Sequence, residues 1–227
     1  MNDIRELLAS LNLEGHNLQL YETALTHSSC NIDKNCEISD YERLEYIGDS
    51  VIGFVSADLI YKIHEEMDQG LMSKLRSYLV CSRSLASYSR LIGLQNYIRT
   101  GHSISHAQLE KSDKILEDVF EALTGAIYLD LGIEVAYEFV RRFLEEDVRN
   151  TGIDAIVDAK TRLQEEFQSE YREAVQYVLI DESGPAHDRT FEVEVRFNGI
   201  ILGRGIGKSK KQAEEAAAAD ALSKRSV

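Results

Sequence analysis

The hydrophobic pattern of this chain changes its period near residue 150. Before that point, helices are predicted near residues 2–11, 18–27, 41–66, 71–92, 112–131 and 133–148. Beyond it, QYVLIDES, TFEVEVRFNG and IILGRGIG are predicted as strands, between the helical segments TRLQEEFQSE and KSKKQAEEAAAADALSKR. The pattern therefore predicts an all-α N-terminal domain and a C-terminal α+β domain of order α-β-β-β-α.

Charge is distributed unevenly between these two parts. The chain has 227 residues and a net charge of −14, which by itself argues against a nucleic-acid-binding protein. However, residues 1–157 carry 14 Lys and Arg against 26 Asp and Glu, whereas residues 158–227 carry 11 against 13. We therefore expect a domain at 1–149, a linker at 150–157 and a domain at 158–227, whose nearly neutral total charge is compatible with a local basic patch.

The sequence disfavours a membrane or secreted protein. It has no apolar run near the ~18–20 residues that span a bilayer, and the acidic N-terminus is unlike a signal peptide. Cys30, Cys36 and Cys81 are odd in number and form no CxxC pair, which is typical of reduced thiols in the cytoplasm. His102 and His106 have metal-like spacing, but their segment, TGHSISHAQLEKSD, is predicted to be a polar loop rather than a zinc site.

Three carboxylates lie on one stripe of the predicted helix YERLEYIGDSVIGFVSADLIY, residues 41–61. Glu42, Glu45 and Asp49 fall within roughly 60° of one another around the helix axis. The apolar residues of the segment occupy a different face, which suits a core. Like charges at these spacings repel by a few tenths of a kcal/mol per pair, so the stripe requires an explanation.

A second predicted helix, KILEDVFEALTGAIYLD, carries Asp118 and Glu121 three residues apart. Two amphipathic helices that each present carboxylates on one side can converge on a shared site. Hard oxygen ligands without nearby cysteine suit Mg²⁺ or Mn²⁺ rather than zinc. Spacing alone leaves a second interpretation open, in which these acids face solvent on two ordinary helices.

Several motifs resemble those of the ribonuclease III family. ERLEYIGDSV resembles its signature helix, commonly written ERLEFLGDSV, and THSSCNIDKNCEISDYERLEYIGD contains the preceding THxS segment. LEDVFEALTGAIYLD resembles the second acidic helix, often written LADxFEALIGAIYLD, and residues 158–227 resemble the double-stranded-RNA-binding domain of bacterial members. The motifs occur in the family's order over nearly the whole chain.

The resemblance implies a metal-dependent endoribonuclease that cleaves double-stranded RNA. It implies a helical nuclease domain that forms a homodimer, with two active sites across one catalytic valley. The expected products carry 5′-phosphate and 3′-hydroxyl ends with two-nucleotide 3′ overhangs. Mg²⁺ is the expected cofactor, with Mn²⁺ as an expected substitute, and the expected roles are the processing of ribosomal precursor and messenger RNA.

The family's site residues are placed on this chain by position. Glu45, Asp49, Asp118 and Glu121 match the metal-binding acids, with Asp49 and Glu121 as the catalytic pair, and Glu42 matches a supporting acid. Two positions depart from the common pattern. Tyr46 stands where the family usually has Phe, near the expected dimer contact, and Gln69 stands where many members carry Glu.

The C-terminal domain supplies the predicted RNA-binding residues. Lys208, Lys210 and Lys211 stand at the start of a predicted helix, where the macrodipole disfavours cations, so we interpret them as a phosphate clamp. Gln164 and Gln168, four residues apart, are suited to hydrogen bonds across a shallow minor groove, and His187 lies in the loop that enters an adjacent minor groove in this family. The lysines and the histidine also fit an ordinary solvated surface.

Two other functions compete with this prediction. A non-catalytic RNA-binding protein with the nuclease fold would have no need of four clustered acids. A metal-dependent phosphodiesterase that acts on structured DNA would have no need of a domain that reads 2′-hydroxyl groups. Assays with duplex RNA, duplex DNA and Mg²⁺ discriminate among the three.

Overall fold

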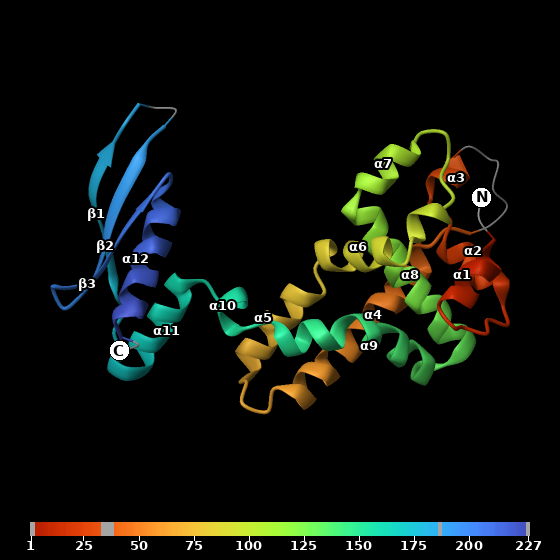
Figure 1. Cartoon of the computed structure of the whole chain (residues 1–227), viewed down its shortest axis with the longest axis horizontal. Helices are drawn as coiled ribbons and strands as arrows, with labels where there is room; N and C mark the ends of the chain where they lie inside the picture. The colour runs from red at the N-terminus through yellow and green to blue at the C-terminus, as the bar shows by residue number, and fades with distance from the viewer. Residues whose placement is uncertain (1–2, 33–38, 186–187, 226–227) are drawn as a thin grey trace. The chain divides into compact units, whose positions relative to one another are not determined.

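The computed structural model describes residues 3–32, 39–185 and 188–225, and it divides the chain into two compact units, Met1–Thr151 and Gly152–Val227 (Figure 1). The regular secondary structure in the described part of the first unit is helical, apart from an isolated bridge between Thr26 and Arg99. Its helices are α1 (Ile4–Ser10), α2 (Leu18–Ala24), α3 (Ser29–Ile32), α4 (Glu42–Ile63), α5 (Gln69–Leu79), α6 (Ser82–Leu91), η1 (Leu94–Asn96), α7 (His106–Lys111), α8 (Asp113–Leu131) and α9 (Ile133–Asn150).

Helices α4 and α8 cross in direct backbone contact. A Cβ atom added to Gly48 of α4 would lie 1.7 Å from the carbonyl oxygen of Glu121 on α8. A Cβ atom added to Gly125 of α8 would lie 2.3 Å from the carbonyl oxygen of Leu44 on α4. Only glycine permits this approach on both sides, and the crossing brings the two acidic helix faces together.

An aromatic cluster forms the core next to this crossing. Tyr88, Phe120, Phe139 and Phe143 pack with ring centroids 5.3 to 5.8 Å apart. Phe120 faces this core although it stands between the two acids of α8 in sequence. The apolar side of α8 is therefore anchored in the core while its acidic side borders the surface.

Short polar side chains fix the starts of several helices. The side chain of Ser112 accepts a hydrogen bond from the Ile115 amide at the start of α8. Asp68 caps α5 and Asp158 caps α11 (Ala159–Tyr171) in the same way. Each cap satisfies an otherwise unpaired amide and contributes about 1 kcal/mol.

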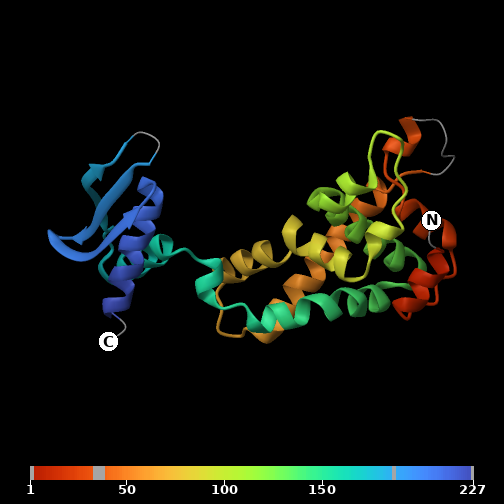
Figure 2. The same cartoon turned by 45° about the horizontal axis from the view of Figure 1, so that its top comes forward.

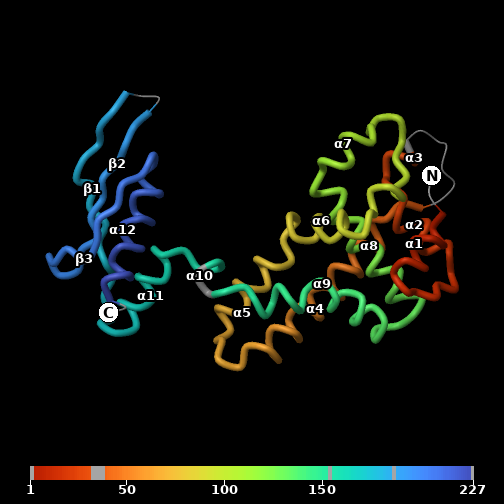
Figure 3. The backbone as a smooth tube through the Cα atoms, viewed as in Figure 1, coloured from red at the N-terminus to blue at the C-terminus, as the bar shows by residue number. Residues whose placement is uncertain are grey.

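The prediction of one helix over residues 71–92 is wrong. The chain turns at Val80 and Cys81, so that α5 packs against α4 and α9 whereas α6 packs against α8 (Figure 3). This turn contains neither Pro nor Gly, and the break arises because the two halves bury their apolar faces on different partners. The predicted polar loop around His106 likewise contains the short helix α7, which Ser105 caps.

The second unit has the order α-β-β-β-α after a short helix α10 (Ile153–Ile156). Strands β1 (Gln176–Ser183), β2 (Thr190–Phe197) and β3 (Ile200–Gly207) form an antiparallel sheet in the order β1-β2-β3. Helix α12 (Lys210–Arg225) packs on this sheet and α11 packs beside α12 (Figure 2). The predicted fold class, all-α followed by α-β-β-β-α, is confirmed.

Small residues let α12 approach the sheet closely. Cβ atoms added to Gly203, Gly205 or Gly207 of β3 would all meet the α12 backbone at 2.6 Å or less. The facing alanines of α12 are buried with Leu163 and Phe167 in the core of this unit. The alanine run therefore serves helix-to-sheet packing.

None of the helices within the described ranges is long and apolar enough to cross a membrane.

Candidate metal centre and RNA-binding surface

An open cleft beside the α4–α8 crossing gathers the acids of both helices. It is lined by Tyr41, Glu42, Glu45, Tyr46, Asp49, Lys114, Glu117, Asp118 and Glu121. Six of these nine residues are acidic, and all five acids that the sequence proposed are among them. Their co-location shows that the two acidic faces border one space rather than separate patches of solvent.

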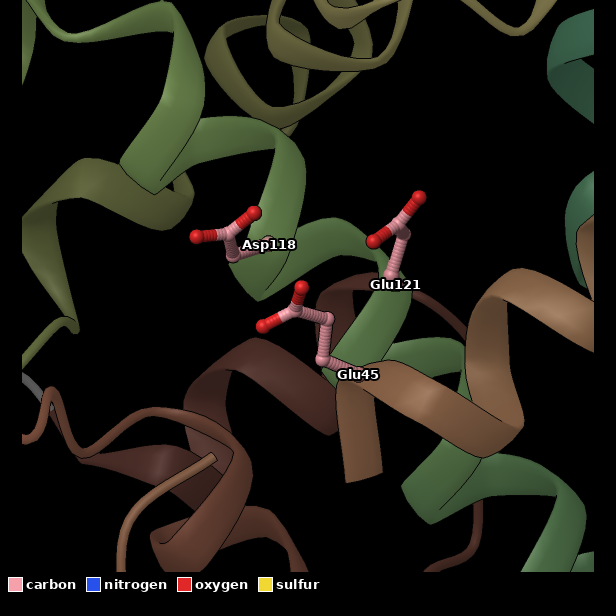
Figure 4. Close-up of side chains that lie close together, drawn as sticks. All are labelled: Glu45, Asp118 and Glu121. Atoms are coloured by element: carbon pink, nitrogen blue, oxygen red, sulfur yellow. The ribbon is translucent and has the colours of Figure 1, made fainter. Parts of the chain in front are cut away.

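Three of the acids converge closely enough to share a cation. Glu45, Asp118 and Glu121 each offer a carboxylate oxygen, and these three atoms lie within 4.8 Å of one another. Figure 4 shows Glu45 reaching from α4 toward Asp118 and Glu121 on α8. Asp118 and Glu121 are buried and Glu45 is half-buried. Such a set of hard oxygen donors suits Mg²⁺ or Mn²⁺.

The other two predicted acids border this group without joining it. Glu42 and Asp49 line the same cleft but are exposed. The charge of Asp49 raises the pKa of Glu121, so the two carboxylates interact electrostatically. The structure thus separates the five predicted acids into a close triad and two flanking groups.

Burial makes the triad unfavourable for full negative charge. Burial and, to a smaller extent, the charges of Asp49, Glu117 and Glu45 together raise the pKa of Glu121 to about 8, against an opposing effect of Lys114. Burial and the charge of Asp118 also raise the pKa of Glu45 above its ordinary value. A bound cation would favour the ionised forms, so the electrostatics of the triad fit a metal site.

Asp118 is held by two groups that the sequence motifs do not single out. The Tyr41 hydroxyl donates a hydrogen bond to Asp118 Oδ2 at 3.2 Å. The Lys114 ammonium lies 2.6 Å from Asp118 Oδ1. Lys114 stands four residues before Asp118 on α8, so helical spacing could have identified it.

Glu117 is the sixth acid of the cleft, and sequence reasoning missed it. It stands where the family pattern given above has Ala. Its carboxylate accepts a hydrogen bond from the Ser82 hydroxyl of α6 at 2.6 Å and lies 3.7 Å from the Lys114 ammonium. Glu117 precedes Glu121 by four residues, and this spacing places the two side chains on the same face of α8, so the sequence could have indicated Glu117.

The predicted RNA-binding residues lie on several parts of the second unit. Gln164 and Gln168 line one shallow groove on α11 together with Thr161, Glu165 and Ser169. His187 lies outside the described residues.

The three predicted lysines differ in their surroundings. Lys210 and Lys211 lie in the first turn of α12, and Lys211 is 3.8 Å from Glu215. Lys208 lies two residues before the first residue of α12. Its ammonium lies 2.7 Å from Asp188 Oδ1, so this lysine has an internal acid partner. Binding of a phosphate by Lys208 would have to compete with this ion pair.

Comparison with known families agrees with this arrangement of the two units. Residues 17–148 match the family described as ribonuclease-III-like, and residues 159–225 match the double-stranded RNA binding motif. The chain belongs to the ribonuclease III family. Ribonuclease III enzymes are endoribonucleases that act on double-stranded RNA, and the predicted activity class is confirmed.

Relatives in the ribonuclease III family match almost the full length of the chain. Ribonuclease 3 of Onion yellows phytoplasma (strain OY-M) is 42% identical over 224 residues, which cover 99% of this chain and 92% of the relative. Ribonuclease 3 of Streptococcus pyogenes serotype M1 is 38% identical over 228 residues, which cover 100% and 99%. The nuclease domain of ribonuclease III from Campylobacter jejuni is similar in structure, with a TM-score of 0.59 and 30% identity over 67% of this chain and 100% of that one.

Proposed function

We propose that this ribonuclease III hydrolyses double-stranded RNA at the cleft between α4 and α8 with the help of Mg²⁺, for which Mn²⁺ can substitute. The observation that carries the proposal is the convergence of Glu45, Asp118 and Glu121 within 4.8 Å. These three carboxylates would hold the cation. When bound, the metal lowers the pKa of a water and neutralises charge on the phosphate and the leaving oxygen.

The roles of the remaining residues follow from their positions in the cleft. Asp49 and Glu121 are proposed as the catalytic pair, because Asp49 borders the triad and the charge of Asp49 acts on Glu121. Glu42 is the supporting acid at the rim. Tyr41 orients Asp118 through its hydroxyl, which donates a hydrogen bond to Oδ2, while Oδ1 lies beside the Lys114 ammonium.

The proposed division of labour follows the two units of the chain. Residues 1–149 would cut and dimerise, 150–157 would link, and 158–227 would bind duplex RNA. The products would carry 5′-phosphate and 3′-hydroxyl ends with two-nucleotide 3′ overhangs. The proposed substrates are ribosomal precursors and other structured RNAs, including messengers, and the proposed compartment is the cytoplasm.

The decisive experiment maps the ends produced from a long RNA duplex with Mg²⁺ and with chelator, beside a DNA duplex of the same sequence. We expect cuts in RNA alone, only with metal, staggered by two nucleotides. Binding without cleavage would support the non-catalytic alternative, and cleavage of DNA would support a phosphodiesterase of another class.

Changing Lys208, Lys210 and Lys211 together to Ala is expected to weaken binding to duplex RNA about equally for different duplex sequences. The slope of log K against log salt is negative, and each lost phosphate contact should reduce its magnitude by about 0.7 to 0.9. Lys208 should contribute least to RNA binding, because it would have to leave its ion pair with Asp188 to contact a phosphate. Binding across a salt series measures this.

The matched control for that triple variant is Lys224→Ala, which removes a cation from the opposite end of α12. The melting temperatures of both variants should show that the domain remains folded. Unchanged binding and an unchanged salt slope in the triple variant would contradict the phosphate clamp.

We also propose that the nuclease unit forms a homodimer through the exposed side of α4. Tyr46, Phe54 and Tyr61 lie on that side with 78%, 55% and 71% of their surface exposed. A groove beside Tyr46 is lined by residues that include Leu20, Leu44, Ile47 and Leu129. Exposed aromatic side chains next to an apolar groove are suited to a self-complementary contact. A Campylobacter jejuni nuclease-domain structure that resembles this chain is described as having a region involved in dimer formation.

Tyr46→Glu is expected to convert the dimer to a monomer and to reduce paired cutting of both strands, because a charge would enter the contact. Sedimentation and mapping of product ends measure the two effects. Leu91→Glu provides a matched control, because Leu91 is 75% exposed on α6. An active monomer of the unaltered 25.6 kDa chain would contradict the dimer.

A further inference from the structure

The side chain of Lys114 places a cation among the proposed metal ligands. Its ammonium lies 2.6 Å from Asp118 Oδ1, 3.8 Å from Glu45 Oε1 and 3.7 Å from Glu117 Oε2. Two of these three carboxylates belong to the triad that would hold the metal. The ammonium therefore neutralises part of the charge that would attract a divalent ion.

A bound divalent metal and the Lys114 ammonium would compete for Asp118 Oδ1. Mg²⁺ binds oxygen at about 2.0–2.1 Å and demands near-octahedral geometry. If Asp118 Oδ1 coordinated the metal, repulsion between the two adjacent cations would favour movement of the ammonium away from its position at 2.6 Å. The Tyr41 hydroxyl contacts Oδ2 and the ammonium contacts Oδ1, so Oδ1 is the oxygen for which the two cations would compete.

Glu117 provides a second position for the displaced ammonium. Lys114 and Glu117 stand three residues apart on α8, and the Ser82 hydroxyl fixes the Glu117 carboxylate at 2.6 Å. The Lys114 side chain is 67% exposed, so it has space to swing. A move from Asp118 toward Glu117 would keep the lysine paired and free Asp118.

We propose that Lys114 is an internal counter-ion that occupies the acid triad until a divalent metal displaces it toward Glu117. Lys114 then sets the metal concentration at which the site fills. The proposal rests on the metal site proposed above. It assigns to Lys114 a role in metal affinity, separate from any contact with RNA.

The test measures Mg²⁺ and Mn²⁺ binding to the full chain without RNA, by titration calorimetry. Lys114→Met keeps the length of the side chain and removes its charge, and we expect it to tighten metal binding about tenfold, or about 1.4 kcal/mol. Lys114→Arg should weaken binding, because a guanidinium binds a carboxylate through two hydrogen bonds and is harder to displace. A general disturbance of the site would weaken metal binding in both variants, so changes of affinity in opposite directions would exclude it.

Lys111→Met is the matched control. The substitution removes the same charge from an exposed lysine of α7 that does not line the cleft. It should leave metal affinity near that of the unaltered chain. In chelator, Lys114→Met should also melt at a lower temperature than the unaltered chain, and saturating metal should narrow this difference. The loss of the internal counter-ion leaves the acids to repel one another only while metal is absent.

The outcomes separate this proposal from the one on which it depends. If neither metal binds the unaltered chain, the proposed metal site is wrong. If metal binds but the Met and Arg variants have unchanged affinity, the counter-ion role is overturned. Slower cleavage by Lys114→Met at unchanged metal affinity would also overturn it, and would assign Lys114 to the RNA phosphate.

Discussion

Changing Glu121 to Gln is expected to slow cleavage at least roughly a thousandfold, which corresponds to about 4 kcal/mol of transition-state stabilisation. The amide keeps the size of the side chain but cannot supply a negatively charged ligand. Glu121 is buried against Asp118 and Glu45, so no other carboxylate of the triad can take its place without moving α8. Asp118→Asn should have a similar effect for the same reason.

Duplex binding by both variants should stay within a few fold of the unaltered chain, because we propose that affinity comes largely from the C-terminal unit, which matches the double-stranded RNA binding motif. Single-turnover cleavage with Mg²⁺ and equilibrium binding in chelator measure the two quantities independently. Glu134→Gln removes an exposed carboxylate from the first turn of α9 and serves as the control. Near-normal cleavage by Glu121→Gln would remove this residue from the metal site.

Changing Gly48 to Ala is expected to destabilise the nuclease unit by about 1–3 kcal/mol or more and to reduce cleavage strongly. The new methyl group would lie 1.7 Å from the Glu121 carbonyl oxygen, so α4 and α8 would have to move apart. That movement separates Glu45 from Asp118 and Glu121. One added methyl group at the helix crossing should therefore disturb both the fold and the proposed metal site.

Gly53→Ala provides a matched control on the same helix. Nothing lies within 4 Å of a Cβ atom added at Gly53, and alanine is the better helix former by about 0.5–1 kcal/mol. Urea unfolding should therefore show opposite changes in the free energy of unfolding for the two variants. Metal titration should show weaker binding only for Gly48→Ala. Equal stability of the two variants would contradict the close crossing.

The sequence by itself was sufficient for the fold class and for five of the six acids that line the cleft, Glu117 being the exception. The change from a helical to an alternating period separates the two units, because each period reflects which side of an element is buried. The positions of Glu45, Asp49, Asp118 and Glu121 are marked by local spacing on two amphipathic helices. The roles of these acids in catalysis, and those of the lysines in RNA binding, remain predictions.

Only the tertiary structure decided how the acids are arranged and what surrounds them. Spacing along a helix reports which residues share a face, but distances between helices depend on how closely their backbones pack, which here depends on Gly48 and Gly125. The break between α5 and α6 has the same origin, since each half follows a different packing partner. The ammonium of Lys114 meets Glu45 only because α4 and α8 cross at this point, and no pattern within either helix contains that contact.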